Sequence, residues 1–499
     1  LSGPSTAFPL WASYPATTMV PFSQDVDAYA IYNNYGLTSF SAIEAKNNDN
    51  SDNSALGKIN LTVDGTNRYV ATTGSDDLNP CTLPGSPCLT IAHAISVAAM
   101  EDSVIVAPGN YALTSVLNIS QDGLVMTAAD ATDKPVITTT QANIIDVNAE
   151  NVTVNGFEFT MGLTNTTGIK GIVSTASNFN QLAVTNNDFI STAALDSEGM
   201  VWSAFAVQLT STAGEIDTVS ITDNTVATSA ANLNVFGRGF YFGSGSANGP
   251  GGLIANNEIK AYYAIQTANI TTDLTVESND INGITMLNAP LNNSVFDVND
   301  NTFSGADMNA NMTSDSLYAV VDIRGIASGS VDFYDNTIEG FSTIGVLSMA
   351  SKEVSLDGNV FTPKATATSF TSLMANTKLM TNGVQGNTYG DEITITGNTF
   401  NAGAANEGTA IIFADHYGVN TPAFADITIG GSAAAEKNTF DADLENYIVL
   451  DEKTGASTAF ALWAPYPATT MKAVTQNVEA LYIHNEYSLP NVAAVELKN

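Results

Sequence analysis

The chain has 499 residues and carries 15 Lys and Arg against 50 Asp and Glu, which gives a formal net charge of −35. This balance excludes nucleic acid as a partner and argues against anionic membrane surfaces, because phosphate groups are bound by clustered Lys and Arg. No apolar run reaches the roughly 18 residues of a membrane-inserted helix. We therefore expect an acidic extracellular or cell-surface protein, for which calcium is a conceivable ligand and no other cofactor is indicated.

The two ends of the chain are copies of one segment. Residues 5–47 and 457–499 align without a gap, and about half of the aligned positions are identical. Three explanations stay open: one unit of a tandem array followed by the start of the next, modules that cap a solenoid or join subunits, or two small β-modules with no role in assembly. If the copies join subunits, their aromatic residues are the interface candidates. These residues are Phe8, Trp11, Tyr14, Phe460, Trp463 and Tyr466.

Residues 48–67 are predicted to link the first copy, residues 1–47, to the main domain, because the stretch opens with Asn, Asp and Ser. A Pro-Gly turn between Cys81 and Cys88 can bring their sulfurs together, and the chain has no other cysteine. The pattern therefore predicts a short-loop disulfide in an oxidising compartment, and the alternative is a pair of free thiols.

Three motifs follow one another between residues 69 and 112: YVATTGSDDLNPC, CLTIAHAISVA and DSVIVAPGNYAL. They resemble the entry segment of pectate-lyase-like right-handed parallel β-helix proteins. The resemblance implies a capping helix over about Leu89–Ala99, a first coil that begins near Val104, a β-helix over residues 68–445 and a C-terminal module over 446–499. It says little of function, because the group contains lyases, hydrolases, adhesins and surface proteins.

Short strands with alternating apolar residues recur through the middle of the chain, and an Asn follows each of them, as in ITITGNTF. One such coil cannot bury its apolar side, whereas a stack of coils can, so the pattern predicts an all-β solenoid. A buried Asn can also bond to the Asn of the next coil and form a ladder. Turn dipeptides of this kind occur in β-sandwiches too, but a sandwich does not require an apolar residue soon after nearly every Asn. The recurring residues are Asn187, Asn224, Asn257, Asn279, Asn301, Asn336, Asn359, Asn398 and Asn438.

Longer stretches interrupt the coils at 228–252, 362–392 and 402–422, and we expect them to be loops beside a lateral groove. The best enzyme-like pair is Asp322 and Arg324. With Val321 and Ile323 pointing inward, both charged side chains should point outward. A surface ion pair is the stronger interpretation, because no paired-carboxylate or metal-binding signature accompanies them.

The sequence therefore favours a secreted structural protein that self-associates through its duplicated ends into a filament, sheath or surface layer. The alternative is a carbohydrate-binding adhesin or tailspike, or a polysaccharide lyase or hydrolase, that acts in the lateral groove. In a glycosylating source, the Asn-x-Ser/Thr sequons would be candidate glycosylation sites. They are Asn60, Asn118, Asn151, Asn165, Asn269, Asn292 and Asn311.

Overall fold

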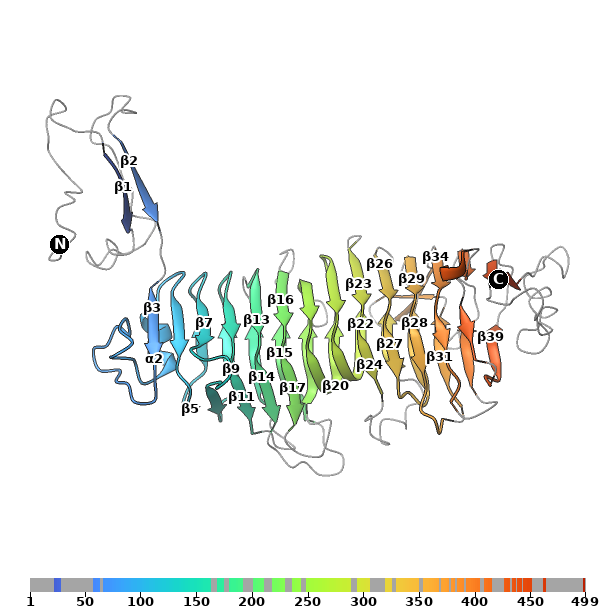
Figure 1. The fold of residues 1–499 in the computed structure, drawn as a ribbon, viewed down its shortest axis with the longest axis horizontal. Coiled ribbons are helices and arrows are strands. Elements are labelled where there is room, and N and C mark those ends of the chain that lie inside the picture. Colours follow the sequence, from blue (N-terminus) through green and yellow to red (C-terminus); the bar gives the residue numbers. More distant parts are fainter. Residues whose placement is uncertain are drawn as a thin grey trace.

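Successive coils stack into a long rod in the computed structural model, and the chain runs from one end of the rod to the other (Figure 1). The structure describes residues 66–450 except for short gaps, and four strands outside this span: β1 (Phe22–Asp27), β2 (Gly57–Thr62), β40 (Ala461–Trp463) and β41 (Leu497–Lys498). The gaps are 163–167, 175–178, 192–200, 211–217, 229–235, 244–247, 289–293, 306–318, 325–328, 350–352, 368, 377, 382–383, 390–391, 404–407, 415–425, 431–432, 437 and 442.

The rod has three faces of parallel strands. The first face is a 15-stranded sheet. Its strands, in spatial order, are β3 (Asn67–Val70), β4 (Ser103–Val106), β7 (Val125–Ala128), β10 (Thr153–Asn155), β13 (Leu182–Thr185), β16 (Thr218–Thr222), β19 (Gly251–Ala255), β21 (Leu274–Glu277), β23 (Val295–Asn299), β26 (Ser330–Tyr334), β29 (Glu353–Asp357), β34 (Glu392–Thr396), β37 (Asp426–Ile429), β40 and β41.

The second and third faces form one 22-stranded sheet, because the long strands β20 (Glu258–Thr267) and β22 (Asp280–Asn288) run through both. The second face also contains β5 (Asn110–Leu113), β8 (Val136–Thr139), β11 (Glu158–Met161), β14 (Asp188–Ser191), β17 (Thr225–Thr228), β24 (Thr302–Ser304), β27 (Thr337–Glu339), β30 (Val360–Thr362), β35 (Thr399–Phe400) and β38 (Thr439–Phe440). The third face contains β6 (Leu117–Ile119), β9 (Asn143–Val147), β12 (Lys170–Ser174), β15 (Val201–Leu209), β18 (Phe236–Phe242), β25 (Ala319–Arg324), β28 (Ile344–Met349), β31 (Thr371–Asn376), β36 (Thr409–Ala414) and β39 (Asn446–Leu450).

This arrangement confirms the predicted all-β right-handed parallel β-helix. It also corrects details of the prediction. The first coil begins at β3 rather than near Val104, and β39 extends the coils beyond residue 445. The three stretches expected to be loops each contain a strand of the third face, namely β18, β31 and β36. The apolar residues of these three strands pack in the core. The glycines and threonines around them therefore did not indicate loops.

The interior is one continuous apolar cluster from Val70 to Leu444. Because the strands pair in register, equal side chains stack on neighbouring coils, as Phe361, Phe400 and Phe440 do with ring centroids 4.9 and 5.2 Å apart. Stacked rings add to the stabilisation that burial provides.

The predicted asparagine ladder is present at the corner between the first and second faces. All nine asparagines are buried, and each of the first eight donates to the next one along the rod. Asn301 is representative: its main-chain N donates to Asn336 Oδ1 at 3.0 Å, and its own Oδ1 accepts from Asn279 N at 3.0 Å. The residue directly before each ladder position from Asn187 to Asn398 has the left-handed backbone, as at Asp300 and Asp335, both with φ of 54°.

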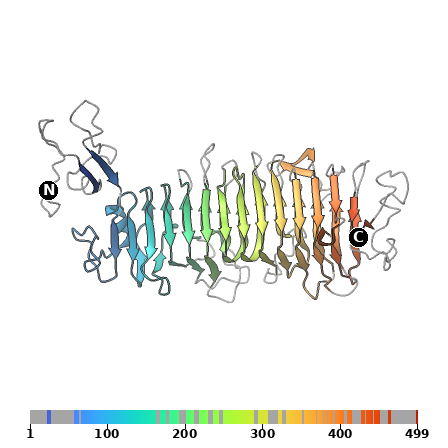
Figure 2. The same cartoon turned by 45° about the horizontal axis from the view of Figure 1, so that its top comes forward.

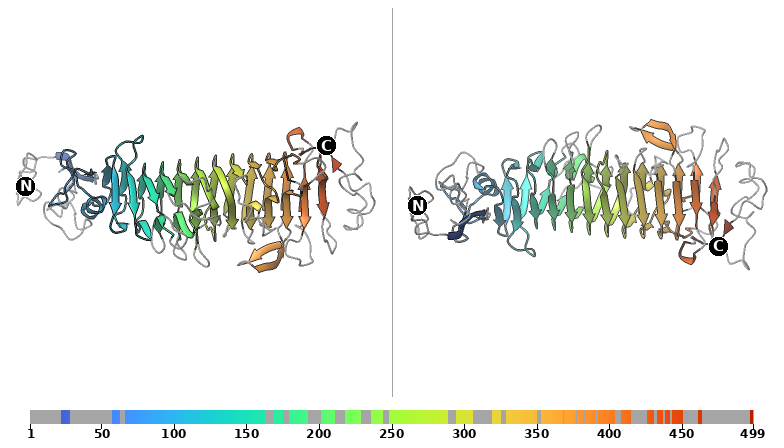
Figure 3. Two further views of the ribbon diagram at one scale, coloured as in Figure 1. Left: turned by 90° about the horizontal axis from the view of Figure 1, so that it is seen from below. Right: turned by 90° about the horizontal axis from the view of Figure 1, so that it is seen from above.

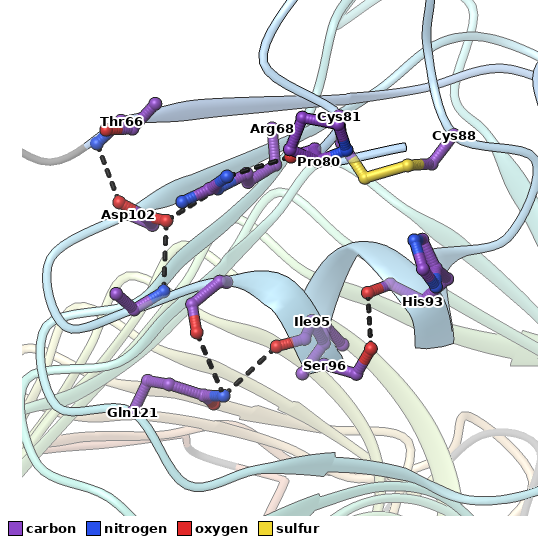
Figure 4. Close-up of polar contacts among 12 residues, drawn as sticks. Thr66, Arg68, Pro80, Cys81, Cys88, His93, Ile95, Ser96, Asp102 and Gln121 are labelled. Carbon is purple, nitrogen blue, oxygen red and sulfur yellow. Dashed lines mark hydrogen bonds and ion pairs between the residues drawn. A yellow bond between two sulfur atoms is a disulfide. The ribbon is translucent and has the colours of Figure 1, made fainter. Parts of the chain in front are cut away.

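Helix α2 (Ile91–Val97) caps the N-terminal end and is shorter than the predicted Leu89–Ala99. The Thr90 hydroxyl accepts from His93 N and begins the helix, whose residues Ile91, Ala94 and Ile95 are buried. Below the cap, Arg68 Nε donates to Asp102 Oδ2 at 2.7 Å in a buried ion pair, which Figure 4 shows beside the helix.

Two further pairings lie outside the three faces. Strands β1 and β2 pair with each other at the N-terminal end (Figure 2). Strands β32 (Lys378–Thr381) and β33 (Val384–Tyr389) form an antiparallel hairpin, which stands out from the side of the rod in Figure 3 and contacts β28. A short 3-10 helix, η4 (Ala434–Glu436), precedes β38. No helix in the described part of the chain is long and apolar enough to span a membrane.

Candidate functional site

A cationic and aromatic cluster lies on the outer side of the third face, where β15, β18 and β20 run side by side. The Arg238 guanidinium carbon lies 5.2 Å from the ring centroid of Phe205, 5.1 Å from that of Tyr241 and 5.8 Å from that of Tyr263. Its Nε donates to Gln266 Oε1 at 2.7 Å. We call these five residues the Arg238 platform. Contact with a ring face stabilises a cation, so three rings and one amide fix the guanidinium in place.

Strand register assembles the platform. Phe205 pairs with Arg238, and Arg238 pairs with Tyr263 on the next coil. Three positions further along the same strands, Tyr241 pairs with Gln266. Between these two outward rows, residues such as Phe240 point into the core and are fully buried. The parallel pairing of β15, β18 and β20 therefore places outward-facing residues from three successive coils side by side.

The accessible part of the platform is polar and aromatic. Phe205 and Tyr263 are 7% and 8% exposed, so they form its floor. Arg238, Tyr241 and Gln266 are half-buried and present their edges to solvent. Burial raises the pKa of the Tyr241 hydroxyl, against the opposing effect of the Arg238 charge. The phenol is therefore neutral at physiological pH and can both donate and accept a hydrogen bond.

A second cation extends the platform toward the N-terminal cap. Lys170 Nζ lies 5.5 Å from the centroid of the Phe205 ring, on the strand next to β15. Burial raises the pKa of the Asp146 carboxyl, and the nearby Lys170 charge lowers it in part. A chain with only 15 basic residues thus places two of them on one aromatic cluster.

On its other side, the platform adjoins a buried apolar cluster. Tyr262, Tyr263, Ile284 and Met286 pack together on β20 and β22, and the two tyrosine rings meet edge to face at 4.8 Å. The outer surface of the third face is therefore polar near Lys170 and apolar near Met286. The boundary between the two regions falls at Arg238.

The predicted pair Asp322 and Arg324 does not form the expected surface site. Val321 and Ile323 are buried in the core as predicted, but Asp322 is only 2% exposed. Its register neighbours Met286 and Leu347 are buried too. The prediction that Asp322 faces solvent is wrong, because this stretch of the outer surface is itself covered. Arg324 lies in β25, and its side chain is outside the described residues.

The structure describes some of the other predicted site residues. Cys81 and Cys88 form a disulfide. The sequon residues Asn118 and Asn151 are exposed, and Asn269 is half-buried. Among the interface candidates, Trp463 lies in β40. The remaining predicted residues lie outside the residues or side chains that the structure describes: Phe8, Trp11, Tyr14, Asn60, Asn165, Asn292, Asn311, Phe460 and Tyr466.

Carboxylates gather on the outer side of the first face. Burial raises the pKa of Asp332, and the neighbouring charges of Asp297 and Glu353 raise it further. Tyr334 shares a hydrogen bond with Asp297. In the described part of the chain, one group of three metal-binding side chains has its donor atoms within 4.8 Å of one another: Cys81, Cys88 and His93. Calcium binding stays a prediction.

The strand pairing identifies the fold. The topology is that of a parallel β-helix, in which each strand pairs with the equivalent strand of the next coil. Similar solved structures include the catalytic unit of a thermostable GH87 alpha-1,3-glucanase from Streptomyces thermodiastaticus, at 16% identity over 74% of this chain and 67% of that chain with a TM-score of 0.42. The mannuronan C-5 epimerase AlgE4 A-module of Azotobacter vinelandii is similar at 12% identity over 73% and 90%, with a TM-score of 0.41. A PL6 alginate lyase in complex with a trisaccharide is similar at 11% identity over 87% and 95%, with a TM-score of 0.44.

Sequence identities this low concern the fold alone, and the assignment of the fold rests on the strand pairing. No family model matches the chain, and no curated protein matches its sequence. Any function must therefore be argued from the residues of this β-helix.

Proposed function

We propose that the protein binds carbohydrate on its third face, at the Arg238 platform. A sugar ring has an apolar C–H face and a rim of hydroxyl groups, so it suits an aromatic ring edged by hydrogen-bonding groups. The platform offers the Tyr241 ring and hydroxyl, the Arg238 guanidinium and the Gln266 amide within one patch. The observation that carries the proposal is the Arg238 guanidinium held by three rings and Gln266.

The fixed position of Arg238 supports a binding role. A free Arg side chain loses rotamer entropy when it binds a ligand, whereas Arg238 is already ordered by Phe205 beneath it and Gln266 beside it. The guanidinium places a positive charge beside the Tyr241 ring, where it attracts the oxygen atoms of a hydroxyl or a carboxylate. Lys170 adds a second positive charge for an acidic sugar. The net charge of −35 repels long polyanions. Binding of an acidic glycan should therefore change with salt concentration, whereas binding of a neutral glycan should not.

Affinity electrophoresis through gels that contain neutral or acidic polysaccharides tests the proposal. The parent chain should be retarded by at least one polymer. Tyr241→Ala and Arg238→Met should each weaken binding about tenfold or more, or ~1.4 kcal/mol, because both remove a central contact. Tyr334→Ala, on the first face, is the matched control and should bind like the parent. Equal binding by all four proteins would place the ligand elsewhere, and no retardation by any polymer would refute the proposal.

A second function, assembly through the duplicated ends, is favoured by one observation. Strand β40 pairs with β37, and β41 pairs with β40, so the copy at residues 457–499 contributes strands to the C-terminal end of the first face. A strand edge can accept a strand from another chain. We propose that this end is the joint of a filament or surface layer of a secreted protein.

Negative-stain electron microscopy of the parent chain and of a chain without residues 457–499 tests this second function. Filaments or sheets should form with the parent and disappear with the deletion. Single rods in both samples would refute the assembly proposal. Carbohydrate binding would be unaffected by either result, because the Arg238 platform lies on coils far from that end (Figure 1).

A further inference from the structure

The N-terminal cap holds two sulfur atoms and one imidazole in a single small space. The donor atoms of Cys81, Cys88 and His93 lie within 4.8 Å of one another. The main-chain oxygen of Asn79 lies 2.8 Å from His93 Nε2, 3.5 Å from Cys88 Sγ and 3.8 Å from Cys81 Sγ. One oxygen thus lies within 3.8 Å of the donor atoms of all three side chains.

Hydrogen bonds hold these residues in place independently of the disulfide. Tyr69 N donates to Cys81 O at 2.7 Å, and Cys88 N donates to Tyr69 O at 2.8 Å, so both cysteines are bound to the same residue of β3. Asn79 Oδ1 accepts from Cys81 N at 2.9 Å. His93 lies in the first turn of α2, which Thr90 caps. Opening the S–S bond therefore leaves both sulfurs beside the imidazole.

We propose that reduction of the Cys81–Cys88 disulfide creates a site for zinc or another thiophilic divalent cation, with Cys81 Sγ, Cys88 Sγ and a ring nitrogen of His93 as ligands. Thiolate and imidazole are the ligands that zinc prefers, and tetrahedral bonds of about 2.3 Å require sulfurs about 3.8 Å apart. Rotation of the freed cysteine side chains supplies this separation. The carbonyl of Asn79 or a water completes the fourth position.

A dithiol reductant transfers two electrons and two protons, becomes a disulfide, and leaves Cys81 and Cys88 as thiols. Binding of the cation releases both thiol protons to solvent, because the thiolate is the ligand. The metal then closes the same loop that the disulfide closed. The cap in Figure 4 would thus stay closed under oxidising and under reducing conditions.

Cobalt titration of the full chain tests the site. The chain is reduced with a phosphine, desalted without oxygen and titrated with Co²⁺, whose thiolate charge-transfer absorption reports sulfur ligands directly. The reduced chain should bind one cobalt with this absorption, zinc should displace it, and the oxidised chain should show none. His93→Gln should weaken cobalt binding at least about tenfold, since even outer-shell changes at metal sites reach that size. Asp280→Asn, at an exposed position of β22 on the body of the rod, is the control and should bind like the parent.

Three results of the cobalt titration would overturn the proposal. They are the absence of thiolate absorption in the reduced chain, equal cobalt binding by Cys81→Ser and the parent, and unchanged affinity in His93→Gln. Circular dichroism before cobalt is added checks that the reduced β-helix is intact. Unfolding on reduction alone would also overturn the proposal, because it requires the main-chain bonds to hold the thiols in place.

Discussion

Replacing Asn301 with Asp changes one atom of the asparagine ladder and should destabilise the rod strongly. Asn301 Nδ2 donates to Asn336 Oδ1 at 3.0 Å, to Val276 O at 2.7 Å and to Asn299 O at 2.8 Å. An aspartate oxygen in its place would face three acceptors. Asn279 still donates to the other oxygen of the side chain through N and Nδ2, which offsets part of the loss.

The size of the effect follows from the lost donors and the buried charge. Each buried polar group left without a partner costs about 1–3 kcal/mol, and an uncompensated buried charge costs about 3–5 kcal/mol. We expect Asn301→Asp to lower the stability of the surrounding coils by ~4 kcal/mol at neutral pH. Burial and the facing oxygens should raise the pKa of the new carboxyl in the folded state. Protonation restores one donor, so the loss relative to the parent should be largest at pH 7 and should shrink as the pH falls toward about 4.

Amide hydrogen exchange and thermal melts at both pH values measure this effect, because coils of a solenoid can open separately and one global midpoint is insufficient. Asn118→Asp is the matched control, since Asn118 is exposed and should tolerate the charge. A melting temperature of Asn301→Asp equal to that of the parent at pH 7, or a deficit that is the same at both pH values, would refute the reasoning.

Three further predictions concern single positions. Asp102→Asn should destabilise the cap by ~3–5 kcal/mol, because Arg68 would keep its buried charge without a carboxylate; a urea melt followed at the cap measures this. Asp332→Asn should raise the melting temperature at pH 7 but not below about pH 4, since the pKa of this carboxyl is raised in the folded state and its ionisation costs stability as the pH rises. Gly283→Ala should lower the melting temperature, because φ at Gly283 is 137° and a Cβ there would collide with Ala261 O.

The fold could be predicted because its determinants are local and repeated. From β13 onward the coils repeat the same short strand, sharp turn and ladder asparagine, so the pattern around Asn398 predicts that around Asn301. The ends of elements were less predictable. The stretch 228–252 has many glycines, yet Phe236, Phe240 and Phe242 in it are core residues of β18. Composition averaged over 25 residues hid a seven-residue strand.

The burial of Asp322 could not be predicted from strand alternation. Alternation predicts which side chains point into the core and which point away from it, and the inward direction was correct for Val321 and Ile323. It does not state whether the outer side of a strand is covered by another part of the chain. Asp322 lies in a row with Met286 and Leu347, and all three are nearly inaccessible. Two apolar residues at outward positions on neighbouring coils were the available signal, but it becomes visible only once the register is known.

Register also explains why the Arg238 platform was missed and where function should be sought in this rod. Phe205, Arg238 and Tyr263 are separated by 25 residues or more along the chain, and only the parallel pairing of β15, β18 and β20 places them side by side. Inward positions must stay apolar to fill the rod, so they carry little functional information. Outward rows have no such constraint. The row from Lys170 through Phe205 and Arg238 to Tyr263 alternates cationic and aromatic side chains before it reaches the apolar cluster at Ile284. A ligand that needs both a ring and a cation finds them together in that row, and Tyr241 lies beside it over the Arg238 guanidinium, which is why Arg238 and Tyr241 are the first positions to substitute.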